Sequence, residues 1–169
     1  MYPTLETKFA PLTLTDPAPA GKVQGYAALF DTPDRGGDVI ARGAFAASLA
    51  RAPSVKLLWQ HDPAQPIGVW DAVAEDARGL KVAGRLIAGV RRGREASALL
   101  AAGALDGLSI GYRAVRAERR GGHRHLLEIE LWEISLVTFP MMPGARLAPP
   151  PAPDAEIAEA LSEAARAFR

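Results

Sequence analysis

Short runs of alternating apolar and polar residues, separated by turn-forming residues, constrain this sequence more than any other feature. Such runs favour β-strands, and they occur at residues 23–30, 55–61, 67–74, 80–87, 108–115 and 126–139. Two short helices are predicted, over residues 43–50 and 94–102. The pattern therefore predicts a mainly β protein, a β-rich α+β fold built as a mostly antiparallel barrel or sandwich.

Two proline-rich stretches, at residues 11–20 and 148–153, set the expected domain boundaries. We expect a flexible N-terminal lead over 1–21, one domain over 22–147, and a proline-rich linker with a short C-terminal helix over 148–169. The last segment has an N-cap residue and apolar residues on one helical face. It fits a docking tail and a frayed C-terminus equally well.

The composition excludes several classes of protein. The chain has 169 residues and no cysteine, which rules out disulfides, thiolate catalysis and cysteine zinc sites. The net charge of +1 is too small to indicate electrostatic attraction to nucleic acid or to an anionic membrane. The N-terminus lacks a signal-peptide pattern, and no apolar run reaches the length of about 18 residues that a membrane span requires. The simplest expectation is a cytosolic, non-redox protein with no membrane or nucleic-acid partner.

His61 follows an apolar row in the predicted strand over 55–61. Strand side chains alternate between two faces, and Val55, Leu57 and Trp59 share one of them. His61 continues this row. We therefore expect a histidine that faces the core rather than solvent.

Glu133 is in phase with the apolar residues that precede it. Ile129 and Leu131 share its face, whereas Glu128 and Glu130 lie opposite and are expected to face solvent. A buried carboxylate is costly unless it is paired, and a histidine would be a suitable partner. The phase thus favours Glu133 over Glu130 as a functional acid, although a β-bulge would reverse it.

Ser109 points away from the apolar row formed by Leu108, Ile110 and Tyr112. The neighbouring Gly107 and Gly111 leave room for the close approach of a substrate carbonyl. A serine, a histidine and an acid in these places would support nucleophilic acyl transfer.

Structural roles remain open for the same three residues. His61 is also compatible with a hydrogen-bonded core histidine. Ser109 is compatible with a small residue that packs in a tight strand, and Glu133 with an ion pair to an arginine. Ser135 is a rival nucleophile, but it has no flanking glycine and is crowded by bulky neighbours.

Five motifs occur in a fixed order along the chain. They are Gly-Tyr-Ala-Ala-Leu-Phe-Asp from residue 25, Gly-Asp-Val-Ile-Ala-Arg-Gly-Ala-Phe from residue 37, Leu-Leu-Trp-Gln-His-Asp from residue 57, Gly-Leu-Ser-Ile-Gly-Tyr from residue 107, and Leu-Trp-Glu-Ile-Ser-Leu-Val-Thr-Phe-Pro from residue 131. This succession strongly resembles the tailed-phage prohead protease family over residues 22–147.

The resemblance implies a serine endopeptidase of the herpesvirus assemblin type, with a barrel of about seven antiparallel strands and a few surrounding helices. His61 and Ser109 match the family histidine and serine, and Glu133 matches the acid of its Leu-x-Glu-x-Ser-Leu-Val motif. The implied substrate is the scaffold or the scaffolding segment of the major capsid protein, and the protease itself. The implied place is the procapsid in the bacterial cytoplasm, for a phage or a gene transfer agent.

The family also implies self-association, as a homodimer or higher, and no metal or cofactor. By analogy, backbone amides at residues 141–146 would form the oxyanion hole. The alternative is a non-catalytic capsid-assembly or scaffold-binding module with the same barrel.

Other polar clusters are weaker candidates. Asp31, Asp34 and Asp38 lack the ligand spacing of a calcium loop, and His123 and His125 fit an exposed basic turn better than a metal site. A third cluster, the arginines at residues 91, 92 and 94, fits a solvated helix start better than a contact with an acidic scaffold or DNA.

Overall fold

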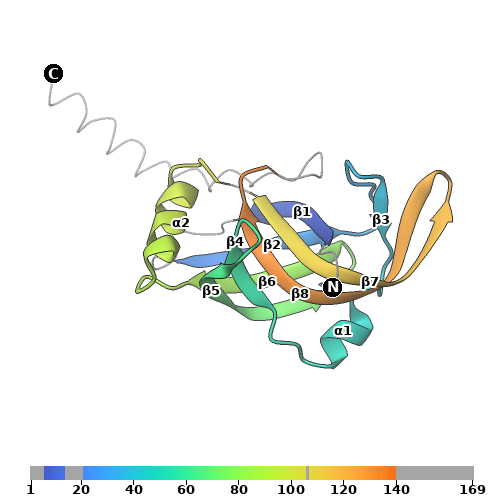
Figure 1. Ribbon diagram of the computed structural model, residues 1–169, viewed down its shortest axis with the longest axis horizontal. Coiled ribbons are helices and arrows are strands. Elements are labelled where there is room, and N and C mark those ends of the chain that lie inside the picture. The colour runs from blue at the N-terminus through green and yellow to red at the C-terminus, as the bar shows by residue number, and fades with distance from the viewer. Residues whose placement is uncertain (1–5, 14–20, 106, 140–169) are drawn as a thin grey trace, which may run out of the picture.

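The structure is a computed structural model that describes residues 6–13, 21–105 and 107–139, with side chains described from residue 21 onward. Most of the described chain lies in strands that curl around one core (Figure 1). The elements are β1 (Glu6–Thr13), β2 (Lys22–Leu29), β3 (Asp38–Ile40), α1 (Ala46–Ala50), β4 (Lys56–Trp59), β5 (Asp62–Glu75), β6 (Gly79–Leu86), α2 (Arg91–Ala101), β7 (Gly107–Arg120) and β8 (His123–Val137).

The strands form one sheet that closes on itself. Their order is β3-β8-β4-β5-β6-β2-β1-β7, and β7 also pairs with β8, so that seven strands form a ring and β3 lies beside it. The predicted mainly β fold of about seven strands is thereby confirmed. Two pairings, β3–β8 and β4–β8, are parallel, and the other strand pairings are antiparallel, as the predicted mostly antiparallel sheet requires.

Strand β1 lies inside the segment that we expected to be a flexible lead, so this expectation is wrong for residues 6–13. The strand pairs with β7 from Glu6↔Tyr112 to Pro11↔Gly107, and it continues onto β2. The physical reason is the need of β7 for backbone partners: its buried N–H and C=O groups on this side would otherwise be unsatisfied.

The observed elements depart from the predicted ones mainly at their ends. Strand β5 is longer than predicted and forms the expected hairpin with β6. Strands β7 and β8 are also longer and meet in a turn at Gly121–Gly122, where φ is 60° and 83°. Positive φ at both positions suits glycine and the twist of a tight hairpin. This hairpin extends beyond the rest of the sheet (Figure 1).

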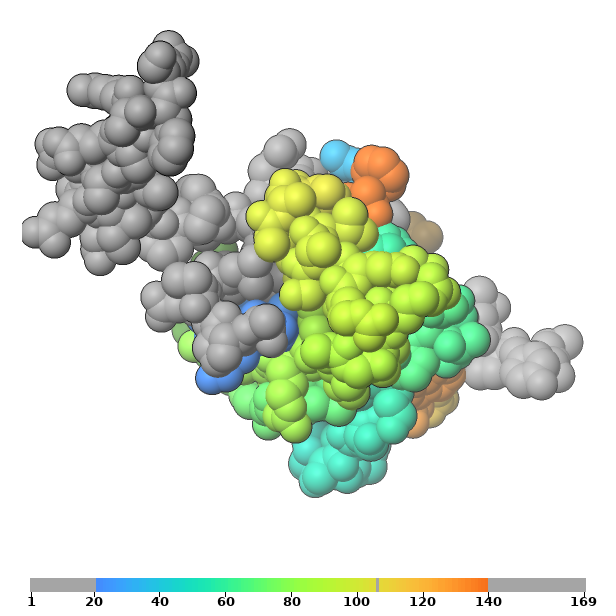
Figure 2. All heavy atoms as spheres, turned by 90° about the vertical axis from the view of Figure 1, so that its left-hand side faces the viewer, coloured from blue at the N-terminus to red at the C-terminus, as the bar shows by residue number. Residues whose placement is uncertain are grey.

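The core lies inside the curled sheet. On β7, Leu108, Ile110 and Tyr112 are at most 1% exposed, and they pack with Leu57, Ile134 and other buried apolar side chains. Helix α2 covers one end of the molecule, where it contacts β5 and β6 (yellow-green in Figure 2). No helix of the described segments is long and apolar enough to span a bilayer. The predicted linker and helix over 148–169 lie outside the described residues.

Candidate active site

A β-bulge places Glu133 on the same face of the sheet as Ser109. The register of β7 and β8 changes from Gly111↔Glu133 to Tyr112↔Leu131, so that Trp132 is the extra residue. Directly opposed residues share a face, and Gly111 is two residues from Ser109. Glu133 therefore points away from the core row, and the expectation that it continues the row of Ile129 and Leu131 is wrong. Beyond the bulge, that row continues through Ile134 and Leu136 instead.

Glu133 is nevertheless buried, and it contacts His61. It is 4% exposed, and its Oε1 lies 2.6 Å from Nδ1 of His61. Because a carboxylate accepts the hydrogen bond, Nδ1 carries the proton and Nε2 is the basic nitrogen of the neutral ring. Only 17% of the His61 side chain is exposed. The two residues thus form the buried histidine–acid pair that the sequence suggested, on a different face of the sheet.

His61 lies in a turn and not on a strand, which corrects the predicted strand over 55–61. Strand β4 ends at Trp59, which pairs with Asp62, and the two intervening residues connect β4 to β5. Gln60 and His61 have φ of 51° and 62°, in the left-handed region. Positive φ at both central residues is typical of a type I′ turn, and each non-glycine residue there costs about 1 kcal/mol.

Contacts with β8 hold this strained turn in place. The backbone amide of Gln60 donates to the carbonyl of Leu136 at 2.9 Å, and its side-chain amide donates to Thr138 Oγ1 at 2.7 Å. The amide of His61 donates to Ser135 Oγ at 3.2 Å. These bonds keep His61 next to β8, so its ring reaches back to Glu133.

Ser109 lies on β7 directly opposite Ser135 of β8. In such a pair the two Cβ atoms lie about 4.5–5.5 Å apart on one face. Ser109 is 0% exposed, and its Oγ has no hydrogen-bond partner within the described part of the chain. Buried hydroxyls in proteins nearly always have such a partner, and a catalytic role is one physical reason for an exception. Ser109 thus lies across the ladder from the residue that contacts both His61 and Glu133.

Ser135, the rival nucleophile, is engaged in the histidine–acid pair. Its Oγ donates to Glu133 Oε2 at 2.6 Å. Neither this contact nor the contact between Gln60 and Thr138 was expected from the sequence. The signal that could have indicated the first contact is the position of Ser135 two residues after Glu133, which places both on one face of a strand.

The other polar clusters form structural contacts. Asp34 accepts a hydrogen bond from the amide of Asp38, and Asp31 pairs with Arg42 at 2.8 Å. Over residues 21–105 and 107–139, no group of three side chains is arranged to hold a metal ion. In the basic turn, His123 Nδ1 lies 3.3 Å from the carbonyl oxygen of Gly37. At the start of α2, Arg91 and Arg92 pair with Glu95, and Arg94 donates to the carbonyl of Ala88. The expected oxyanion loop at 141–146 lies outside the described residues.

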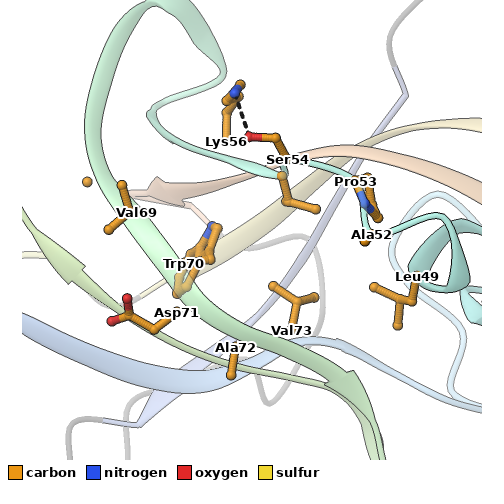
Figure 3. A pocket seen from close by; sticks show the side chains of 12 residues that line it. Leu49, Ala52, Pro53, Ser54, Lys56, Val69, Trp70, Asp71, Ala72 and Val73 are labelled. Carbon is orange, nitrogen blue, oxygen red and sulfur yellow. Dashed lines mark hydrogen bonds between the residues drawn. The ribbon is translucent and has the colours of Figure 1, made fainter.

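A cleft of about 380 Å³ lies between strand β5 and the connection from α1 to β4 (Figure 3). Val69, Trp70 and Val73 line it from β5, and Leu49 faces them from α1. Lys56, also in its lining, lies opposite Glu133 in the β4–β8 register. None of Ser109, His61 and Glu133 lines the cleft, so it is distinct from the site described above.

Gly111 gives the Glu133 carboxylate its space, and its replacement tests this packing. A Cβ at Gly111 would lie 2.2 Å from Glu133 Oε1, so the Gly111→Ala variant must displace the carboxylate. We expect a loss of about 10²-fold in kcat, because misplacement by about 1 Å can have this effect. Cleavage assays would measure it. Gly89→Ala is the matched control, since a Cβ there meets nothing closer than 4.0 Å and the variant should retain activity.

Comparison with known proteins identifies the family of this chain. The family model of the caudovirus prohead serine protease matches residues 12–159. The prohead protease of Enterobacteria phage HK97 is 32% identical in an alignment of 150 residues that covers 86% of this chain and 67% of that protein. The capsid assembly protease of bacteriophage T4 has a similar fold, with a TM-score of 0.67 over 80% of this chain and 98% of that chain, at 13% identity. The resemblance found in the motifs is confirmed, and the chain belongs to the caudovirus prohead serine protease family.

Proposed function

We propose that this serine protease cleaves peptide bonds with Ser109 as nucleophile, His61 as general base and Glu133 as the acid that orients His61. The observation that carries the proposal is the 2.6 Å contact between His61 Nδ1 and Glu133 Oε1, on the face of the sheet that Ser109 shares. A carboxylate that holds the proton of Nδ1 makes Nε2 the basic nitrogen of the ring, as a general base requires.

In the proposed reaction, Ser109 Oγ attacks the scissile carbonyl while His61 Nε2 takes the hydroxyl proton. His61 then gives this proton to the leaving amine, and an acyl-enzyme on Ser109 remains. Water attacks the acyl-enzyme with His61 again as base, which releases the acid product and restores Ser109. Glu133 keeps its carboxylate against Nδ1 throughout and stabilises the imidazolium. The oxyanion donors at residues 141–146 stay a prediction.

The burial of Ser109 adds a requirement to this mechanism. Ser109 is 0% exposed, so a substrate carbonyl reaches its Oγ only if the groups that cover it move aside. Movements that open and close an active site are common steps in enzyme reactions. We therefore expect activity to depend on a substrate or partner that opens this face.

The proposed substrate is a capsid or scaffold protein within the prohead, and the protease itself. The names of the relatives, a prohead protease and a capsid assembly protease, support a capsid protein as substrate, and the scaffold and the protease itself are added from the resemblance of the motifs. Self-association and a location in the bacterial cytoplasm belong to the same proposal. The non-catalytic assembly module is not favoured, because all three members of the proposed triad are present.

Labelling by a serine-directed phosphonate tests the nucleophile. In assembled proheads we expect the reagent to modify Ser109 alone, because only an activated serine reacts quickly. Mass spectrometry of the digested protein would locate the adduct. A Ser109→Ala sample should remain unlabelled. An adduct on Ser135, or no adduct on an assembled sample, would contradict the assignment.

A further inference from the structure

We infer that Ser135 is a positioning residue whose hydroxyl fixes both members of the His61–Glu133 pair. This inference rests on the proposed function, since it assigns a role within the proposed triad. Ser135 is 0% exposed, and its hydroxyl contacts the acid on one side and the histidine backbone on the other.

One hydroxyl serves both contacts because a serine has one donor and two acceptor positions. The Ser135 hydroxyl donates to Glu133 Oε2, with 2.6 Å between the two oxygens, and Ser135 Oγ accepts from the amide of His61, with 3.2 Å between nitrogen and oxygen. The distance between the acid and the backbone of the histidine is therefore fixed through a single atom. A hydrogen bond to a charged acceptor is also stronger than a neutral one.

Two hydrogen bonds and the space beside a glycine fix the position of the Glu133 carboxylate. Oε1 binds His61, Oε2 binds Ser135, and the missing side chain of Gly111 leaves the space that the carboxylate fills. Without Ser135, one oxygen would lose its partner in a buried place, and the carboxylate could rotate away from Nδ1. The strained turn at His61 would lose one of its bonds to β8 at the same time.

The same contacts explain why Ser135 is not the nucleophile. A nucleophilic hydroxyl gives its proton to the base, whereas the proton of Ser135 is directed at Glu133. Ser135 is also flanked by Leu58 on β4 and by Ser109 on β7, its two partners in the sheet.

The first measurement is the cleavage of a capsid-protein segment by Ser135→Ala. We expect kcat to fall about 10- to 100-fold with KM nearly unchanged, the effect of losing one hydrogen bond to a charged group. Ser48→Ala is the matched control. Ser48 is 1% exposed, and its Oγ also accepts a backbone amide of β8, that of Leu131 at 3.0 Å, but it does not contact the pair. It should lose a similar amount of thermal stability while its kcat remains normal.

The second measurement is the proton resonance of His61 Nδ1–H, observed by NMR in the inactive Ser109→Ala background. The chain has three histidines, so His61→Gln identifies the signal. We expect a downfield signal that persists with Ser48→Ala and with Ser135→Thr, which keeps a hydroxyl, and that moves or disappears with Ser135→Ala.

The outcomes separate the two proposals. An unchanged signal in a folded Ser135→Ala protein would overturn the positioning role, whatever the activity. A changed signal with normal cleavage would support the positioning role and contradict the proposed triad instead. If Ser135→Ala does not fold, Ser135→Thr decides, since loss of the signal despite a retained hydroxyl would also overturn the inference.

Discussion

The Ser109→Ala variant is expected to leave capsid protein uncut, with kcat lower by about 10⁶-fold. This is the order of loss when a serine protease is deprived of its nucleophile, because the acyl-enzyme cannot form. The fold should survive the change. The removed oxygen is buried and has no hydrogen-bond partner among the described residues, so its loss leaves no other group unsatisfied. We therefore expect a melting temperature equal to or above that of the wild type.

Mass spectrometry of the capsid-protein N-terminus measures the first expectation, and thermal unfolding measures the second. Ser135→Ala is a useful companion, because it removes a hydroxyl from the residue directly across the ladder. It should slow cleavage without abolishing it. Normal maturation of capsids by Ser109→Ala would show that Ser109 is not the nucleophile.

The position of Glu133 shows how far strand phase can predict a site. Phase correctly placed Ser109 opposite the core row of Leu108 and Ile110. Strand phase also selected Glu133 over Glu130, because Glu133 was expected to share the face of Ile129 and Leu131. The bulge at Trp132 moves Glu133 to the opposite face. A regular strand would have pointed Glu133 into the core and away from Ser109. A bulge is set by the pairing of two strands, and a single sequence contains no pattern that locates it.

The turn at His61 was hidden for a related reason. Tight hairpin turns are recognised by glycine or asparagine at positions with positive φ, and this turn contains Gln60 and His61. The alternation of Leu57 and Trp59 therefore appeared to continue to His61. The strain is offset by contacts with Ser135 and Leu136, which are distant in sequence. Residues whose local conformation disagrees with their type are frequent at functional sites.

Long-range pairing also explains what was missed at the N-terminus. The segment of β1 contains Lys8 and Pro11, which interrupt the apolar alternation of a strand. The position of β1 is set by its pairing with β7 and β2. The sequence alone does not indicate which edges of these two strands need a partner. The element types of the ring were otherwise predictable, because its segments are short apolar runs bounded by turn residues, with the clearest alternation in β6.

Replacing Glu133 by glutamine is the second change with a large expected effect, a fall of about 10⁴-fold in kcat. Glutamine keeps the shape of the side chain but has no charge to hold the imidazolium. Its amide group also competes for hydrogen bonds with Nδ1 of His61 and the hydroxyl of Ser135, so the tautomer of the ring is no longer fixed. Cleavage kinetics with a capsid-protein segment would measure the effect.

Glu130→Gln provides the control, on the same strand and with the same chemical change. Glu130 pairs with Arg113 through two contacts, at 2.6 Å and 2.8 Å, and the hydrogen bond from Arg113 lowers the pKa of its carboxyl. It does not contact His61, so its replacement should leave kcat unchanged. An equal fall in kcat in the two variants would mean that the reaction depends on the negative charge of β8 in general and not on the contact between Glu133 and His61. A large loss in Glu133→Gln alone would assign the effect to the 2.6 Å contact between the acid and His61.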